Sequence, residues 1–283
     1  MSWQLLTLIS VLSLSTSVLL QRVLIHKDKT DPFAYAIIFQ AAVGLILTLC
    51  ALISGFSLPN IQTVIIPAII SIILFGVGHI VYAKTLQKVE ASSFSVLFAT
   101  QAVWTMLLGI ALLNESLSGV QIIGVVLIFA SVAVLTKNIA TVFKQKGVLL
   151  GLLTGLLFGV AIYAWSYVGR FTDPISWAAI SFVGTSLVAF LIRPSAIKKM
   201  KPLMRPAVLL RLLGLAVFYA VGSLTMLLAY KYGSFATVSP LRQTSIVVTV
   251  LLALTFLPAE RNRVRRKLLA ATICMAGVVL IIL

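Results

Sequence analysis

Hydrophobic and polar positions alternate along this chain in long blocks, not residue by residue. Ten apolar blocks, most of them near the roughly 20 residues that a helix needs to cross a bilayer, are separated by polar joints. They are Trp3–Val23, Pro32–Ile53, Ile61–Ala83, Ser92–Leu113, Leu117–Thr136, Gly147–Val168, Pro174–Ile192, Ala207–Tyr230, Phe235–Leu257 and Leu268–Leu283. The last block is short, so we expect its helix to begin a turn earlier, with Arg265, Arg266 and Lys267 extending toward the headgroups. The pattern predicts an all-α integral membrane protein with ten transmembrane helices.

The blocks repeat halfway along the chain. Thr30-Asp31-Pro32 precedes the second block, and Thr172-Asp173-Pro174 precedes the seventh. Each Asp-Pro pair predicts a helix N-cap with proline in the first turn; a role for either aspartate in coupling is the alternative. We therefore predict two homologous five-helix repeats, residues 1–136 and 147–283, joined by residues 137–146. Because five is odd, the repeats must lie in opposite orientations, as in many secondary transporters with a site near the bilayer midplane.

Composition agrees with a chain that lies almost wholly in the membrane. Hydrophobic residues make up 61% of it and charged residues 10%, with a mean hydropathy of +1.15, which excludes an ordinary soluble domain. Cys50 and Cys274 both fall inside apolar blocks, so we expect buried, unreactive thiols.

The net charge of +16 is unevenly placed. Nineteen of the 22 lysines and arginines lie in or beside the joints after blocks 1, 3, 5, 7 and 9. This bias predicts cytoplasmic basic joints and both termini outside the cell membrane. It argues against a nucleic-acid partner and instead predicts that the basic segments 193–211 and 261–267 contact anionic lipid headgroups.

Two local patterns concern helix packing. Gly147, Gly151, Gly155 and Gly159 share one face of the sixth block, which favours close helix packing, with a thin cavity-lining face as the alternative. Pro240 predicts a kink in the ninth block beside several polar residues. The matching position in the first repeat is Ser95, so the sequence predicts a kink in one repeat and not in the other.

The ends of the two halves resemble a known family. Leu112-Leu113-Asn114-Glu115-Ser116-Leu117, followed by Gln121-Ile122-Ile123-Gly124, resembles the end of an EamA repeat, in the drug/metabolite transporter superfamily. The second half echoes it with Pro240, Glu260 and an apolar run containing Gly277. The resemblance implies a ten-helix carrier whose central cavity is lined mainly by helices 3, 4, 8 and 9, with parts of 1 and 6. Members of the family move amino acids, metabolites or drugs, often outward.

Besides Ser95 at the position that matches Pro240, this sequence departs from the family in two respects. No glycine follows Glu260 at the spacing of Gly124 from Glu115. The family resemblance also implies termini in the cytoplasm, whereas the charge bias of this chain predicts termini outside, and we follow the charge bias.

Arg242 is the sharpest chemical signal, because it lies well inside the ninth block. An unpaired arginine in lipid costs at least a few kcal/mol, so its side chain should face the protein interior or water. It could bind a substrate carboxylate or phosphate together with its neighbour Gln243. Pairing with a loop acid or with carbonyls freed by Pro240, or snorkelling to the interface, are the alternatives.

The other substrate-binding candidates are polar or aromatic residues inside apolar blocks. His79 and Tyr82 lie in the third block; a lone intramembrane histidine either titrates near neutral pH or serves packing. The remaining candidates could line a cavity or join helices, and they are Gln101, Trp104, Thr105 and Tyr163.

The acidic residues all lie at block ends or in joints. Glu115 and Glu260 could gate the pathway or couple transport to protons, or could simply stabilise helix ends. Because no carboxylate lies at mid-membrane while Arg242 does, we favour an anionic or zwitterionic substrate. The sequence carries no metal-ligand cluster, nucleophile elbow or phosphate-binding glycine loop, so we expect neither an enzyme nor a cofactor.

These observations predict a secondary transporter, acting as an exporter of amino-acid-like or other anionic or zwitterionic solutes by alternating access. Ten helices can enclose a complete pathway, so a monomer is sufficient. The alternative function is a lipid-handling flippase or lipid-modifying membrane protein, which would require a lateral opening between helices and would be favoured by a polar cluster at one membrane face. A non-transporting membrane scaffold, favoured by a closed and dry interior, is the third alternative.

Overall fold

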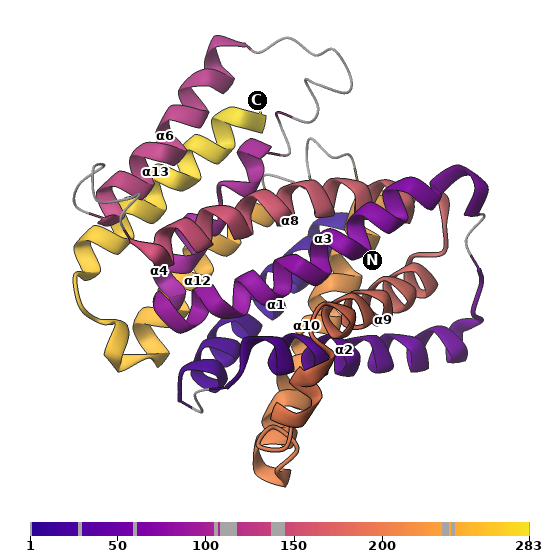
Figure 1. Ribbon diagram of the computed structural model, residues 1–283. Helices are drawn as coiled ribbons and strands as arrows, with labels where there is room; N and C mark the ends of the chain where they lie inside the picture. Colours follow the sequence, from indigo (N-terminus) through magenta and orange to yellow (C-terminus); the bar gives the residue numbers. More distant parts are fainter. Residues whose placement is uncertain are drawn as a thin grey trace.

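The computed structural model describes residues 2–27, 30–58, 61–104, 107, 118–136, 145–233, 238 and 241–282. Over these residues the chain is helical with short connections (Figure 1). The first half contains α1 (Trp3–Lys27), α2 (Pro32–Ser54), α3 (Ile61–Lys88), α4 (Ala91–Phe98) and α6 (Gly119–Thr136). The second contains α8 (Lys146–Phe171), α9 (Pro174–Ile192), η1 (Pro194–Lys199), α10 (Pro206–Tyr232), α12 (Ser245–Phe256), η2 (Pro258–Glu260) and α13 (Val264–Ile282).

Six of the described helices are long and apolar enough to cross a membrane, namely α1, α2, α3, α8, α9 and α10. Two shorter apolar helices cover Gly119–Val134 and Leu241–Phe256. The all-α membrane fold is therefore confirmed, and the count of ten crossings stays a prediction. The final helix begins at Val264, one turn before its apolar block, as expected.

The two Asp-Pro pairs begin helices as predicted. The Asp31 carboxylate accepts hydrogen bonds from the N–H groups of Phe33 (3.0 Å) and Ala34 (3.2 Å), which no carbonyl within α2 can satisfy. The Asp173 carboxylate likewise accepts from the N–H of Ser176 at 2.8 Å at the start of α9. Pro32 and Pro174 follow in the first turn, where a missing N–H costs nothing.

Corresponding helices of the two halves pack against one another in antiparallel fashion. The Ser186 hydroxyl, late in α9, donates to the Ile37 carbonyl, early in α2, at 2.9 Å. Gln121, early in α6, donates to the Ile281 carbonyl at the end of α13. α1 and α3 of the first half correspond to α8 and α10 of the second, so the pair α1–α10 is the counterpart of the pair α8–α3. Both pairs make extensive contacts, as do α2–α9 and α6–α13. This arrangement fits an inverted repeat.

Gly124 and Gly277 meet where α6 packs against α13. A Cβ atom at Gly124 would lie 2.6 Å from the Gly277 carbonyl oxygen, and one at Gly277 would lie 2.7 Å from the Gly124 carbonyl oxygen. Gly277 therefore occupies the structural place of Gly124, although its spacing from Glu260 differs from that between Glu115 and Gly124.

Helices are interrupted at matching places in the two halves, whereas the asymmetric kink expected at Pro240 stays a prediction. α4 ends at Phe98, a turn follows at Ala99 and Thr100, and residues 101–104 are helical again. In the second half, residues 241–243 are helical, Thr244 is a turn and α12 begins at Ser245. At both turns the N–H bonds three residues back, Thr100 to Leu97 and Thr244 to Leu241. The interruption therefore does not require proline. Pro240 itself lies outside the described residues.

Four glycines on one face of α8 pack against other segments of the chain. A Cβ at Gly151 would lie 2.7 Å from Leu97 Cδ1, and one at Gly159 would lie 2.8 Å from the Gln101 carbonyl oxygen. A Cβ at Gly147 would lie 2.9 Å from Val89 Cγ1, and one at Gly155 would meet Thr100. The predicted packing role is confirmed, because these glycines let α8 approach α3 and the interrupted α4 closely.

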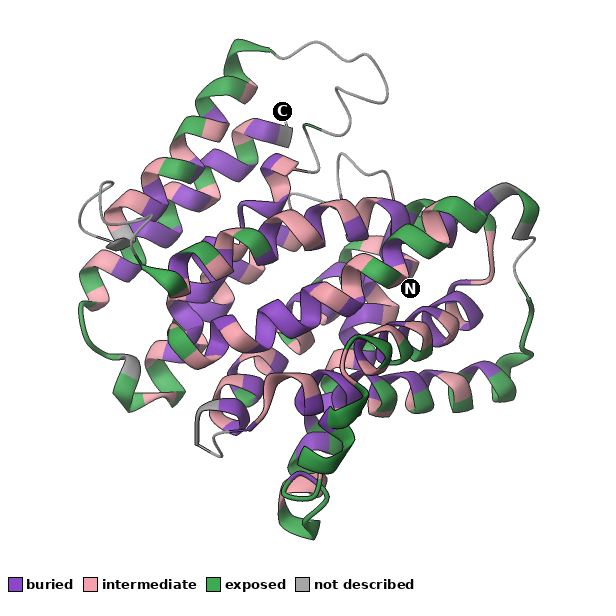
Figure 2. Cartoon of the chain, viewed as in Figure 1, coloured by how far each residue is buried: buried purple, intermediate pink, exposed green. Residues whose placement is uncertain are grey.

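Figure 2 shows buried residues gathered between the helices and exposed residues along their outer sides. Many exposed side chains are large and apolar, such as Ile53 at 87% exposure and Leu210 at 73%, as a lipid-facing surface requires. Cys274 is buried, as expected, but Cys50 is exposed on α2, so the expectation for that thiol is wrong. Lys267 is also buried, at 4% exposure, and pairs with Glu90 instead of extending toward headgroups.

Candidate functional site

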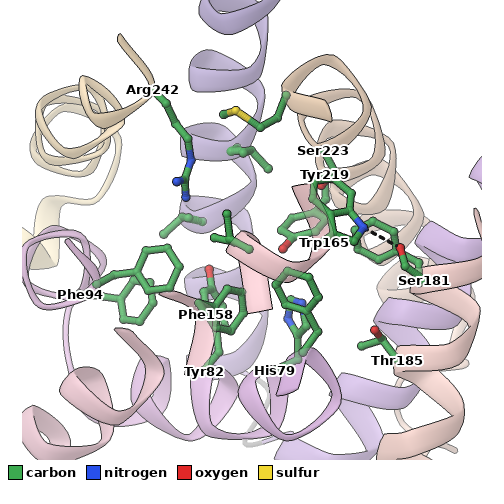
Figure 3. Close-up of a pocket in the computed structure, with 17 residues that line it drawn as sticks. His79, Tyr82, Phe94, Phe158, Trp165, Ser181, Thr185, Tyr219, Ser223 and Arg242 are labelled. Carbon is green, nitrogen blue, oxygen red and sulfur yellow. Dashed lines mark hydrogen bonds between the residues drawn. The ribbon is translucent and has the colours of Figure 1, made fainter. Parts of the chain in front are cut away.

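A cavity of about 110 Å³ lies at the centre of the helices (Figure 3). Its residues recur every three or four positions, which places them on one face of each helix. They are Leu14 and Val18 on α1, Phe75, His79 and Tyr82 on α3, Phe94 and Phe98 on α4, Phe158, Ile162 and Trp165 on α8, Ser181, Phe182 and Thr185 on α9, Tyr219, Ser223 and Met226 on α10, and Arg242.

A second cavity of about 70 Å³ adjoins the first and shares Arg242 and Met226 with it. Its own lining is more polar and includes Ser95, Gln101, Gln243 and Thr249. The resemblance implies the first, third, fourth, sixth, eighth and ninth of the ten predicted helices, and all six contribute to the two cavities. The seventh, which is α9, contributes three residues as well, and the resemblance did not imply it.

Arg242 stands where the two cavities meet. Its side chain extends into the larger one from the segment before the Thr244 turn (Figure 3). Its Nη2 donates to Gln101 Oε1 at 3.2 Å, so a residue just before the second interruption meets one just after the first. Among the described residues that line either cavity there is no aspartate or glutamate. The guanidinium therefore gives this apolar interior a net positive potential.

Aromatic rings form most of the wall opposite Arg242. Five rings have centroids 4.9 to 6.4 Å from that of His79, those of Phe39, Phe75, Tyr82, Phe158 and Tyr219. The His79 side chain is 4% exposed and lies within this cluster. Packing thus accounts for the position of His79, while its contact with the cavity keeps a binding role open.

Tyr82 presents a hydroxyl that has no hydrogen-bond partner among the described residues. The residue is 4% exposed, and its ring is held edge-on against Phe94 with centroids 4.7 Å apart. Leaving a buried hydroxyl unsatisfied costs about 1–3 kcal/mol. A ligand atom or water in the cavity that accepts this hydrogen bond would remove that cost.

Hydrogen bonds hold the far side of the cavity in place. Trp165 Nε1 donates to Ser181 Oγ at 2.9 Å, drawn as the dashed line in Figure 3. Trp177 Nε1 donates to the Trp165 carbonyl at 3.0 Å. These bonds join α8 to α9 and fix the Trp165 ring, so this wall is rigid.

The structure brings together five of the predicted substrate-binding residues: His79, Tyr82, Gln101, Arg242 and Gln243. Trp104 packs beside Gly159, and neither it nor Tyr163 lines these two cavities. Thr105 and Glu115 lie outside the described residues. Glu260 lies in η2, between α12 and α13.

The sequence analysis missed the phenylalanines and the polar residues of α9 and α10. The signal that could have found them is the spacing i, i+4, i+7, which places Phe75, His79 and Tyr82 on one face of α3. Phe158, Ile162 and Trp165 repeat it on α8, and Tyr219, Ser223 and Met226 on α10. Taken alone, however, each such stripe also fits ordinary core packing.

Two comparisons with known proteins agree with this architecture. The model of the EamA-like transporter family matches residues 1–137 and again residues 145–283. The chain therefore belongs to the EamA-like transporter family, and it is a multi-pass membrane transporter of small molecules. One solved crystal structure is 16% identical with a TM-score of 0.68, covering 99% of this chain and 95% of its own, which shows a shared fold. No curated protein matches the chain.

Proposed function

We propose that this protein is a secondary carrier of small anionic or zwitterionic organic solutes, such as amino acids. The observation that carries the proposal is Arg242 in the central cavity, with no acidic residue among the described lining residues. A cationic substrate would meet only repulsion from the guanidinium, whereas a carboxylate could form a charge-assisted, bidentate pair with it. The aromatic wall opposite would accommodate the apolar part of such a solute.

The unpartnered Tyr82 hydroxyl adds a second contact for the substrate. It would donate a hydrogen bond to an acceptor at the aromatic side of the cavity, while Arg242 binds the anionic group at the other side. Two fixed contacts orient a small molecule better than one, and they set a minimum size for it. Gln101 supports this role, because its hydrogen bond holds the guanidinium in the cavity.

Transport would occur by alternating access, with the two five-helix repeats, residues 1–136 and 147–283, moving about the cavity. On the basic face, where α1, α3 and α9 end, ion pairs join the halves. The Asp31 carboxylate lies 3.0 Å from Lys199 Nζ and 3.5 Å from Arg193 Nη1. Glu90 pairs with Lys267 on the same face. These contacts must separate for a solute to enter from that side.

The proposed orientation follows from charge. The basic face would be cytoplasmic, with both termini outside, and ten crossings would complete the pathway within one monomer. A solute entering at the basic face would then be exported. Separating Asp31 from Lys199 and Arg193 costs little, because both cationic side chains are partly exposed. Lys267 is buried, so water or another anion must replace Glu90 as that pair separates.

The test compares the thermal unfolding midpoint of purified wild type, Arg242→Gln and Arg205→Gln. Amino acids, organic acids, sugars, nucleotides and cationic drugs are added in turn. A ligand at 100 times its Kd stabilises the native state by about 2.7 kcal/mol. We expect an anion or zwitterion to raise the midpoint of wild type and of Arg205→Gln, whose exposed cation lies at the start of α10, but not of Arg242→Gln. Stabilisation by cations alone, equal in all three proteins, would refute the site and the substrate class together.

A further inference from the structure

A separate polar cavity opens on the basic face, away from Arg242. It occupies about 510 Å³ between the connection from α3 to α4 and the start of α13. Its lining consists of Glu90, Ser93, Asn262, Arg263, Arg266 and Lys267. Three cations and one acid in so small a space leave an excess of positive charge.

Glu90, the one acid among the described lining residues, is already paired. The Lys267 ammonium is buried, at 4% exposure, and forms an ion pair with Glu90. A buried lysine requires such a partner, because removing its charge from water costs several kcal/mol. The charges of Glu90 and Lys267 therefore cancel, and the positive charge of Arg263 and Arg266 remains.

Arg266 shows that this remaining charge is not fully satisfied. Its Nη1 atom is buried and has no hydrogen-bond partner within the part of the chain that the structure describes. Arginine carries five N–H donors in a planar group that matches the oxygens of phosphate. A buried guanidinium nitrogen without an acceptor is rare, and an oxyanion in the cavity would satisfy it.

The backbone adds to the same electrostatic preference. α13 begins at Val264, directly after Arg263, so the positive end of its dipole lies at the cavity. Arg263 has φ of 58°, a left-handed conformation that is uncommon for a residue with a side chain. Asparagine would adopt this conformation more readily than arginine, so the strain at this position brings no gain in stability.

An open groove of about 400 Å³ lies beside this cavity. It is lined by Ala133 and Val134 near the end of α6, and by Arg265, Arg266 and Leu269 on α13. Arg266 lines both spaces, so a ligand could place a charged group in the cavity and an apolar chain in the groove. That combination of charge and apolar length is the chemistry of an anionic phospholipid.

We propose that the cavity between α4 and α13 binds a phosphate oxyanion, supplied by the headgroup of an anionic phospholipid whose acyl chain lies in the groove between α6 and α13. Arg263 and Arg266 pair with the phosphate oxygens, and the Glu90–Lys267 pair forms the floor. The site lies on the basic face and does not depend on what the central cavity transports. Lipid bound there would hold α13 against the connection before α4.

The test titrates delipidated, full-length protein in a neutral detergent. The probes are dioleoyl phosphatidylglycerol, dioleoyl phosphatidylcholine and inorganic phosphate, and the readout is the concentration that gives half of the maximal rise in thermal midpoint. The variants are Arg263→Asn/Arg266→Gln and the matched control Arg170→Gln/Lys231→Gln, which removes two exposed cations from the ends of α8 and α10, opposite the basic face. Arg266→Gln alone serves if the double variant does not fold.

We expect phosphatidylglycerol to stabilise wild type and control at the same concentration. Each cation near a lipid headgroup changes affinity about five-fold, so the double variant should need roughly 25-fold more lipid. Phosphatidylcholine should require a higher concentration to stabilise wild type, and that concentration should not change in the variants. If inorganic phosphate alone reproduces the full effect, the oxyanion site stands and the lipid source is wrong. Equal titrations in the double variant and the control would overturn the site.

Discussion

Replacing Gly159 by alanine would push α8 away from residues 101–104, the segment whose Gln101 side chain accepts a hydrogen bond from Arg242. A Cβ at this position would lie 2.8 Å from the Gln101 carbonyl oxygen and 2.9 Å from Trp104 Cβ. Ordinary carbon contacts lie near 3.5–4.0 Å, so the segments must separate by roughly 0.7 Å. Overpacking of this kind costs about 1–3 kcal/mol. Because Gln101 accepts the Arg242 hydrogen bond, the displacement reaches the proposed binding group as well.

Gly214→Ala is the matched control, since a Cβ at Gly214 in α10 would meet nothing within 4 Å. Both changes gain the same helix propensity, about 1 kcal/mol, so their difference isolates the packing cost. At about 2–4 °C per kcal/mol, Gly159→Ala should unfold about 2–12 °C below Gly214→Ala in a thermal melt of purified protein. Ligand-induced stabilisation should also weaken in Gly159→Ala alone. Equal midpoints for the two variants would show that α8 does not approach Gln101 this closely.

Four further results follow from the ion pairs, the aromatic wall and the thiols. Glu90→Gln leaves Lys267 buried without its partner and should lower the free energy of unfolding by up to about 3 kcal/mol, whereas Glu90→Asp should recover part of it; equal denaturation curves would contradict the pair. Burial by itself raises the pKa of the Asp31 carboxyl, but the hydrogen bond and charge of Lys199 and the N–H groups of Ala34 and Phe33 outweigh burial and hold the pKa below 3.8. The stability from Asp31 is thus complete above that pH and is lost as pH falls through the folded-state pKa, so acid melts of Asp31→Asn should show a smaller loss than wild type. Tyr82→Phe should weaken the stabilising effect of any substrate without lowering the unligated midpoint, because its hydroxyl has no partner among the described residues; an unchanged ligand response would exclude that contact. A membrane-permeable maleimide should label Cys50 and spare Cys274 in the folded protein, and mass spectrometry that found the reverse would contradict their exposures.

Hydropathy alone was enough to find the all-α membrane fold, because each helix must cover its own backbone in lipid. The Asp-Pro helix starts and the packing role of the α8 glycines followed from local chemistry, and both are present. The interruption at Ala99 and Thr100 was not predictable, since neither proline nor glycine marks it in the sequence.

The site was predicted only in part, for a related reason. Arg242, His79 and Gln101 stand out in an apolar chain, and a charge in lipid must face the interior. The phenylalanines that make most of the wall do not stand out, because an aromatic stripe on a helix is ordinary core material. Which stripe lines a cavity depends on how six helices converge, and no local pattern encodes that convergence.

The mutual contact of Gly124 and Gly277 bears on how such a chain could arise. Each glycine meets the carbonyl of the other, as a residue does at the two-fold axis of an isologous dimer. In a half-length ancestor, one glycine would have met its own copy in a second molecule inserted the opposite way up. Any substitution of that glycine would have placed two new side chains at the interface, one from each copy. Fusion of two such genes would remove that constraint, because each side of the axis could then change alone, and one half could acquire an Arg242 without duplicating its charge.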